Sequence, residues 1–372
     1  MVTDSVPRMS VPAPSAPTGL FVRSDKVVIG GGAGLCVLAG VSHYAGWSSV
    51  LAFVVAAGAI CLLASLVGRS VEQLGDRFGP GATGVLQSAL GNLPELFICI
   101  FSLRAGLVDV VRAALVGSIL ANLLLVLGIA FFVGGLKHGT QQLGSERART
   151  IVVLMLLSVT AWVIPSLAHF VHSPASEHET TFSVLVSVVL LALFALSLPF
   201  SLRRDSGDAE EEGPGHEAPR WPLWLAIGML AAAGALAAFV SDWFVVALEP
   251  SMDSLGISQA FAGLVVVAIA GNAVENVVGV QLAAAGRSEY AFSIVLNSPI
   301  QIALVLAPVL VLVSQIFGLA SLTLVLSPLL VVSLLLAIIL AAFIAFDGES
   351  TWLEGASLVA LYGIIAAAFW WG

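Results

Sequence analysis

Two glutamates stand inside long apolar stretches of this chain, where a charge is costly. Glu275 follows the letters GNAV, and Glu95 follows the letters GNLP. A carboxylate buried among apolar residues is unfavourable unless a cation pairs with it or a proton neutralises it. These two positions therefore predict a site that binds a cation, a proton, or both in turn.

The two glutamates belong to two similar stretches, residues 91–128 and 271–308. The stretches align without a gap at an offset of 180 residues (271 − 91 = 180). The offset pairs Gly91 with Gly271, Asn92 with Asn272, Glu95 with Glu275, Gly106 with Gly286, and Ser118 with Ser298. Chance similarity between apolar helices would match Leu and Val, whereas these matches fall on polar and Gly positions. We interpret the stretches as two copies of one repeat.

The two copies supply a set of oxygen ligands. Hard cations such as Ca²⁺ take about 6–8 oxygen ligands. The absence of thiolate and imidazole from the set argues against a dedicated zinc or copper site. Pro94 is expected to clash with the carbonyl of Leu90 and so to loosen its helix, and Pro299 is expected to loosen a later one. The predicted cation ligands are Glu95, Glu275, Asn92, Asn272, Ser118, Asn122, Ser298 and Gln301.

The elements that must position these ligands are membrane helices. Only 10% of the 372 residues are charged, 59% are hydrophobic, and the mean hydropathy is +1.05. A spanning helix needs about 20 apolar residues, and the continuous apolarity excludes barrel strands. We predict an all-α integral membrane protein with about eleven transmembrane helices at 27–44, 48–68, 82–103, 113–133, 151–168, 181–200, 222–246, 259–285, 289–317, 322–346 and 352–371.

Glu95 falls in the third predicted helix and Glu275 in the eighth, so the two copies cross the membrane in opposite directions. Inverted repeats with a binding site at the midplane are a recurring transporter architecture. The predicted organisation is a disordered cytoplasmic tail at 1–26, a leading transmembrane helix at 27–44, a first five-helix repeat at 48–201, an acidic cytoplasmic linker at 202–221 and a second, inverted five-helix repeat at 222–371.

The positive side chains set the orientation. With a cytoplasmic N-terminus, only Arg104 and Arg112 of the 14 Lys and Arg residues lie outside, which leaves twelve inside (14 − 2 = 12). This bias predicts a cytoplasmic N-terminus and an external C-terminus. The tail lacks the apolar region of a signal peptide, and the pattern suits a bacterial inner (plasma) membrane. No basic run indicates a nucleic-acid partner. The oligomeric state stays open.

Several motifs resemble the calcium/cation antiporter superfamily, and most of all its proton/calcium exchanger branch. They are SLVGRSVEQLGDRFGPGATGVLQSALGNLPEL and GSILANLLLVLG in the first copy, and GNAVENVVGVQLA and SPIQIALVLAP in the second. The resemblance extends over nearly the whole chain from about residue 48. It implies that Glu95 and Glu275 are the central cation ligands, with Asn122 and Gln301 as their polar neighbours.

The chain also departs from that branch, at Leu93-Pro94 (usually Ala-Thr), Asn276 (often His) and Asn297 (usually Gly). A Pro before the first glutamate is more like the sodium/calcium branch. These departures leave the coupling ion open between H⁺ and Na⁺.

The expected function is secondary active exchange of Ca²⁺, or a similar divalent cation, for H⁺ by alternating access at one shared carboxylate site. Without the cation, two close carboxylates repel each other, which favours protonation. No resident cofactor is expected. A sodium-coupled exchanger and a passive cation channel remain alternatives. An intramembrane hydrolase with an acid pair is the remotest, because no zinc-protease or nucleophile-elbow motif is present and the repeat has no role in it.

Three features outside the repeats have open roles. Glu72, near Arg69 and Arg77, is either part of an entry or proton path or an interfacial surface acid. The acidic linker is either a solvated connection or a weak cation-attracting or regulatory segment. The loop with His169, His172 and His178 beside Glu177 and Glu179 could bind a metal, although its spacing matches no strong site.

Overall fold

The fold is almost entirely helical in the part of the chain that the computed structural model describes. That part comprises residues 20–75, 77, 86–87, 89–143, 146–205 and 219–371. The elements up to residue 255 are α1 (Arg23–Tyr44), α2 (Ser49–Gly75), α4 (Leu93–Arg104), α5 (Val108–Leu120), η1 (Ala121–Val126), α6 (Leu127–His138), β1 (Gln141–Gln142), α7 (Glu146–Phe170), η2 (Pro174–His178), α8 (Glu179–Asp205) and α9 (Leu223–Leu255).

The remaining elements are α10 (Gln259–Phe261), η3 (Ala262–Val267), α11 (Ala268–Gly271), α12 (Ala273–Ala284), α13 (Ser288–Gln301), η4 (Ile302–Leu306), α14 (Ala307–Ile316), α15 (Pro328–Asp347), β2 (Glu349–Ser350) and α16 (Trp352–Trp370). The segments η1, η3 and η4 are π-helical, and η2 is a 3₁₀ helix. The short strands β1 and β2 pair antiparallel and join two loops far apart in sequence.

Long apolar helices confirm the membrane class. Within the described residues, nine helical runs are long and apolar enough to cross a membrane. A tenth is reached if the pair Gln259–Gly271 and Asn276–Ala284, bent by 63°, forms one span. The predicted span at 82–103 includes residues outside the described part, and α4 alone has 12 residues, too few to cross. The total of eleven therefore stays a prediction.

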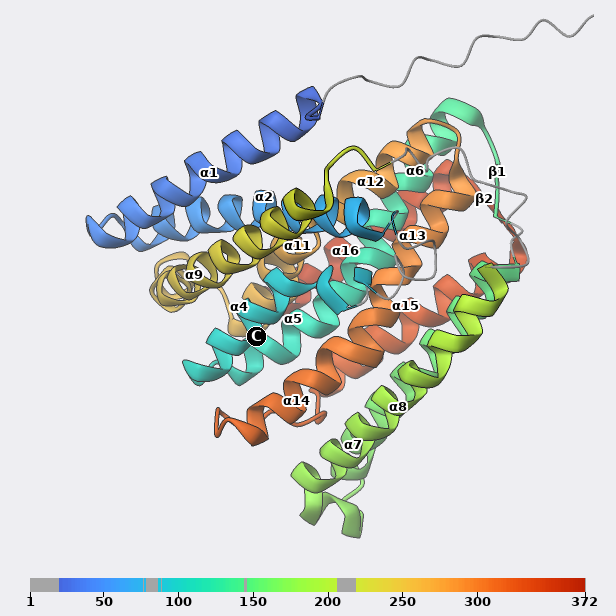
Figure 1. Ribbon diagram of the computed structural model, residues 1–372. Helices are drawn as coiled ribbons and strands as arrows, with labels where there is room; N and C mark the ends of the chain where they lie inside the picture. The colour runs from blue at the N-terminus through green and yellow to red at the C-terminus, as the bar shows by residue number, and fades with distance from the viewer. Residues whose placement is uncertain are drawn as a thin grey trace, which may run out of the picture.

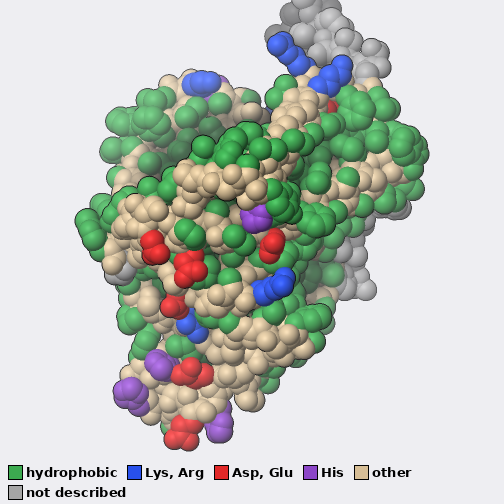
Figure 2. All heavy atoms as spheres, turned by 90° about the vertical axis from the view of Figure 1, so that its left-hand side faces the viewer, with side chains coloured by type: hydrophobic (Ala, Val, Ile, Leu, Met, Phe, Trp, Pro, Cys, Tyr) green, Lys and Arg blue, Asp and Glu red, His purple; other side chains and the backbone are tan. Residues whose placement is uncertain are grey.

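The helices form three groups (Figure 1). α1, α2 and α9 lie together along one side, α7 and α8 form a hairpin on the opposite side, and α4, α5, α6, α12, α13 and α16 lie between them. Apolar side chains cover much of the surface in Figure 2, with acidic and histidine side chains scattered among them. Outward-facing apolar residues such as Val37 and Phe239, 68% and 64% exposed, are expected where helices meet lipid rather than water.

The two predicted copies have matching elements at the predicted offset. α4 begins at Leu93 and α12 at Ala273, and both have 12 residues. A shift of 180 carries η1, at 121–126, to 301–306, and η4 occupies 302–306. The residues before α4 and α12 share one backbone conformation: Asn92 has φ −94° and ψ 17°, and Asn272 has φ −103° and ψ 25°. The agreement therefore includes irregular segments as well as regular helix.

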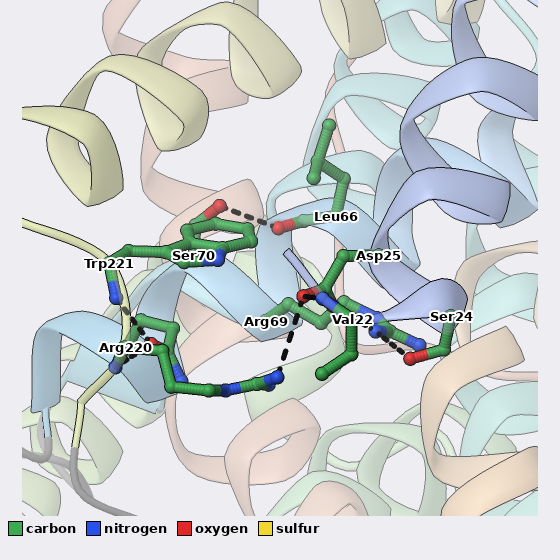
Figure 3. Close-up of polar contacts among 9 residues, drawn as sticks. Val22, Ser24, Asp25, Leu66, Arg69, Ser70, Arg220 and Trp221 are labelled. Atoms are coloured by element: carbon green, nitrogen blue, oxygen red, sulfur yellow. Dashed lines mark hydrogen bonds and ion pairs between the residues drawn. The ribbon is translucent and has the colours of Figure 1, made fainter. Parts of the chain in front are cut away.

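A polar cluster joins α1, α2 and the start of α9 (Figure 3). Asp25, in the first turn of α1, is buried; its carboxylate lies 2.5 Å from Arg69 Nη1 and 3.8 Å from Arg220 Nη1. The Gln73 side-chain oxygen on α2 accepts from the backbone N–H groups of Arg220 and Trp221, at 2.7 and 3.0 Å. The cluster fixes the entry of α9 against the end of α2.

Two predicted segment bounds change in the structure. α1 starts at Arg23, so the last four residues of the predicted 1–26 tail are helical; the Asp25 side chain accepts from the backbone N–H of Val22 and stabilises this start. Residues 1–19 lie outside the described part. α8 continues to Asp205, into the predicted linker, and residues 206–218 of that linker also lie outside the described part.

The helices α5 and η3 cross with their backbones in direct contact. A Cβ added to Gly117 would lie 2.4 Å from Leu264 Cα, and one added to Gly263 would lie 2.3 Å from Val110 O. Small residues allow such close approach between membrane helices. Because Gly117 directly precedes Ser118, this crossing fixes the position of Ser118 relative to η3 in the second copy.

Candidate functional site

Glu95 is the third residue of α4, just after a break in the helical path. Gly91 and Asn92 form a turn, and α4 begins at Leu93. The break confirms the expected irregularity of the helical path before Glu95. Pro94 lies in the first turn of α4, where its missing N–H removes no hydrogen bond of α4. It cannot donate to the carbonyl of Leu90, which agrees with the end of the preceding helical turn at that residue. The positive end of the α4 dipole favours a carboxylate at this position.

The Glu95 side chain is fully buried between the two copies. Ser118 Oγ donates to Glu95 Oε1 across 2.5 Å, and both residues have 0% exposure. On another side, a Cβ on Gly271 would lie 3.2 Å from Glu95 Cβ. The carboxylate of the first copy thus lies directly against the helix break of the second.

Asn122 connects the first copy to the second. Its Nδ2 atom donates toward three oxygens: Ser118 O at 2.9 Å, Asn272 Oδ1 at 3.3 Å and Ser298 Oγ at 3.4 Å. Ser298 Oγ also donates to Asn272 Oδ1 at 3.1 Å. An amide nitrogen has two hydrogens, so the three contacts cannot all be full hydrogen bonds at once. The network can therefore rearrange without leaving the site.

One buried oxygen of this network has no protein partner. Among the described residues, Asn122 Oδ1 makes no hydrogen bond, although Asn122 is 0% exposed. Buried acceptors are almost always satisfied by protein, water or an ion. This oxygen is therefore suited to a cation or a water molecule beside Glu95.

Not every predicted ligand belongs to the hydrogen-bonded group. Five do: Glu95, Ser118, Asn122, Asn272 and Ser298. Asn92 and Gln301 are buried, 8% and 5% exposed, but no hydrogen bond among the described residues links either to those five. Glu275 is the third residue of α12, the position that Glu95 has in α4. The side chain of Glu275 lies outside the described part.

The other candidate positions are exposed or partly exposed. Glu72 is on the exposed side of α2. In the histidine loop, His169 Nδ1 pairs with the carboxylate of Glu179 at the surface. The described residues contain no group of three or more His, Cys, Asp or Glu side chains that could hold a metal ion, so the metal-binding hypothesis for His169, His172 and His178 has no support there.

Sequence reasoning missed the three π-helical segments and the residues that contact them. η1 contains Asn122, η4 directly follows Gln301, and η3 leads to the break at Asn272. π-turns inside α-helices are often found at functional sites. The sequence held one partial signal of these contacts, the Gly-Ser pair at 117–118. A glycine beside a polar residue in an apolar helix favours close packing against another helix, and Gly117 lies against η3.

The chain as a whole is similar to known membrane exchangers. The family model described as sodium/calcium exchanger protein matches residues 48–203 and 225–371. The chain is 36% identical over 352 residues to a Ca(2+)/H(+) antiporter of Synechocystis sp., covering 90% of this chain and 94% of that protein. It is 35% identical over 352 residues to the Ca(2+)/H(+) antiporter ChaA of Bacillus subtilis (strain 168), covering 92% and 97%. The solved structure of native YfkE matches with a TM-score of 0.77 at 34% identity, over 92% of this chain and 98% of that one.

Proposed function

The chain belongs to the sodium/calcium exchanger protein family, and from that premise we propose that it exchanges Ca²⁺ for H⁺ across a membrane. The names of its relatives from Synechocystis and Bacillus subtilis state this exchange for those proteins. One observation in this chain carries the proposal: a fully buried carboxylate, Glu95, lies where oxygen-bearing side chains of both copies meet. Family and site together favour a transporter over an enzyme.

The architecture that we propose for this activity is one leading helix followed by two inverted five-helix repeats. The offset of 180 residues between the starts of α4 and α12 (273 − 93 = 180), and between the ends of η1 and η4 (306 − 126 = 180), supports the repeat. Membership in an exchanger family with bacterial relatives supports the plasma membrane as the location. The distribution of Lys and Arg supports a cytoplasmic N-terminus and an external C-terminus.

In the proposed cation-bound state, Ca²⁺ is held by the carboxylates of Glu95 and Glu275. The free Asn122 Oδ1 supplies a third oxygen. A serine hydroxyl both donates and accepts, so Ser118 can donate to Glu95 when the cation is absent and turn a lone pair toward the cation when it is present. All of these are hard oxygen ligands of the kind Ca²⁺ takes.

In the proposed proton-bound state, one or both carboxylates are protonated after the cation leaves. An empty, doubly ionised site in a low-dielectric interior is unfavourable. The two neutralised states are therefore the ones that can reorient between the two sides, which couples Ca²⁺ movement to H⁺ movement. Asn122 maintains contact between the copies in both states because it has more acceptors within reach than hydrogens.

The test is Ca²⁺ uptake into sealed vesicles driven by a pH difference. Glu95→Gln and Glu275→Gln should each abolish uptake, because an amide binds Ca²⁺ weakly and cannot carry the exchanged proton. Glu249→Gln, an exposed position near the end of α9, is the matched control and should transport normally. ΔpH-driven uptake by either site variant at the control rate would contradict the shared carboxylate site.

The coupling ion is tested separately. An imposed Na⁺ gradient at clamped pH should drive no Ca²⁺ uptake by the wild-type protein. Uptake under that gradient would replace H⁺ with Na⁺ in the proposal, and flux that ignores both gradients would indicate a channel.

A further inference from the structure

Trp162, on α7, donates a hydrogen bond into the irregular part of the second copy. Its indole Nε1–H reaches Ala303 O at 3.0 Å. Trp162 is 1% exposed, and Ala303 is the second residue of the π-helical segment η4. The bond therefore joins α7, in the peripheral hairpin, to a segment beside the candidate cation site.

A π-turn needs such a donor more than a regular helix does. Its backbone bonds run from i to i+5, and helices are distorted where an outside group enters the normal i to i+4 ladder. A buried carbonyl left without a partner costs free energy. The indole N–H only donates, so Trp162 satisfies a carbonyl at the position where the ladder is irregular.

The segment η3 has a similar arrangement on its own side. The hydroxyl of Tyr362, on α16, lies 3.5 Å from Leu264 O, within η3. This hydrogen bond is longer than the one made by Trp162. Among the described residues, two of the three π-helical segments thus have a carbonyl that faces a buried aromatic donor from another helix.

The geometry of η4 sets the direction of two candidate ligands. Gln301 is the last residue before η4, and Ser298 lies one turn earlier, where it donates to Asn272 at 3.1 Å. Each residue of a helix turns the chain by about 100°. If η4 relaxed to regular α-helix, Ser298 and Gln301 would rotate relative to α14 by an angle of that order.

We propose that Trp162 is a positioning residue for the cation site. Its indole N–H holds the π-turn at Ala303 and thereby keeps Ser298 and Gln301 directed at the cation. Trp162 contacts no cation itself, and its effect passes through the backbone of η4. This inference rests on the proposed Ca²⁺/H⁺ exchange and adds a determinant of Ca²⁺ affinity to it.

The test is Trp162→Phe, which keeps an aromatic ring and removes the N–H. Trp221→Phe is the matched control: Trp221 is also 1% exposed, but among the described residues its Nε1 makes no hydrogen bond, and it lies in the polar cluster between α2 and α9. In vesicle uptake, Trp162→Phe should raise the half-saturating Ca²⁺ concentration by about five- to tenfold, which corresponds to roughly 1–1.4 kcal/mol. Its maximal rate should stay within about twofold, because the loss concerns ground-state binding.

Three results would overturn the proposal. One is an unchanged half-saturating concentration in Trp162→Phe. Another is the same increase in Trp221→Phe. The third is a fall in maximal rate alone, which would assign Trp162 to packing or folding.

A binding measurement separates this inference from the proposed function. Ca²⁺ titration of the melting temperature in detergent reports affinity without any transport. Trp162→Phe should shift that titration to higher Ca²⁺ by the same factor, and an unshifted titration overturns the positioning role. If the wild-type protein binds Ca²⁺ in this titration but shows no ΔpH-driven uptake, the proposed exchange fails while the positioning role is still decided by the shift.

Discussion

Replacing Gly117 by alanine should force α5 away from η3. The added Cβ would lie 2.3 Å from Leu264 O, 2.4 Å from Leu264 Cα and 2.7 Å from Leu264 C. These are backbone atoms, so no side-chain rotation can relieve the overlap. Ordinary van der Waals separation begins at 3.4 Å, so the overlap with the α-carbon of Leu264 alone requires a displacement of about 1 Å (3.4 − 2.4 = 1.0).

That displacement has two measurable effects. Overpacking of this kind costs about 1–3 kcal/mol of stability. If the shift moves Ser118 away from Glu95, their 2.5 Å hydrogen bond lengthens toward 3.5 Å (2.5 + 1.0 = 3.5), beyond the range of an O–H···O bond. Loss of a hydrogen bond to a charged group is worth about 1.5 kcal/mol or more, so ΔpH-driven Ca²⁺ uptake should fall about tenfold.

The assay compares Gly117→Ala with Gly228→Ala, in α9. A Cβ on Gly228 has no atom within 4 Å, and alanine favours helix over glycine by up to about 1 kcal/mol. Gly228→Ala should therefore keep the wild-type melting temperature in detergent, or raise it slightly, and transport normally. A Gly117→Ala protein that matches Gly228→Ala in melting temperature and uptake rate would refute the close approach of α5 and η3 as the cause.

Three further predictions concern the site and the polar cluster. Asn122→Leu removes the donor shared by Asn272 and Ser298 together with the free oxygen, so the half-saturating Ca²⁺ concentration for vesicle uptake should rise about tenfold or more; an unchanged value would exclude Asn122 from the site. Asp25→Asn leaves Arg69 without its carboxylate, and because Arg69 is 31% exposed the cost should be about 1–3 kcal/mol, less than for a fully buried pair; a lower melting temperature with unchanged uptake per folded molecule supports this, and an unchanged melting temperature contradicts it. Chelation of Ca²⁺ should lower the melting temperature of the wild-type protein and leave that of Glu95→Gln unchanged. Starting from a Ca²⁺ concentration one hundred times the dissociation constant, the wild-type protein should lose about 2.7 kcal/mol of stability. An equal drop in the melting temperature of both proteins would place the bound Ca²⁺ elsewhere.

The sequence was most informative where one pattern occurred twice. The equal spacing of Glu95 and Glu275 predicted matching helices, and the structure has α4 and α12 at that spacing. Polar residues in apolar helices have few places to lie other than against one another. For this reason the amino-acid pattern alone could predict that Ser118, Asn122 and Ser298 lie together.

The sequence was least informative where tertiary contacts choose between local alternatives. A π-turn and an α-turn differ by one residue in the same apolar segment, and the donor to η4, Trp162, lies 141 residues away from Ala303. The start of α1 at Arg23 likewise depends on Asp25 meeting Arg69, 44 residues along the chain. The sequence around Pro94 could not show that a new helix starts at Leu93, because a proline that interrupts a helix and one that begins a helix differ only in where the preceding turn ends.

The spacing shared by α4–α6 and α12–α14 also limits where the chain can change length. One residue inserted before Ser118 or Ser298 within these blocks would rotate the following side chains by about 100° and turn the serine away from its partner. The turn between α7 and α8, residues 171–178, carries none of the candidate ligands from the two copies, and most of its side chains are exposed. An epitope inserted there should leave exchange intact, and antibody access to it in sealed vesicles would show on which side of the membrane the turn lies.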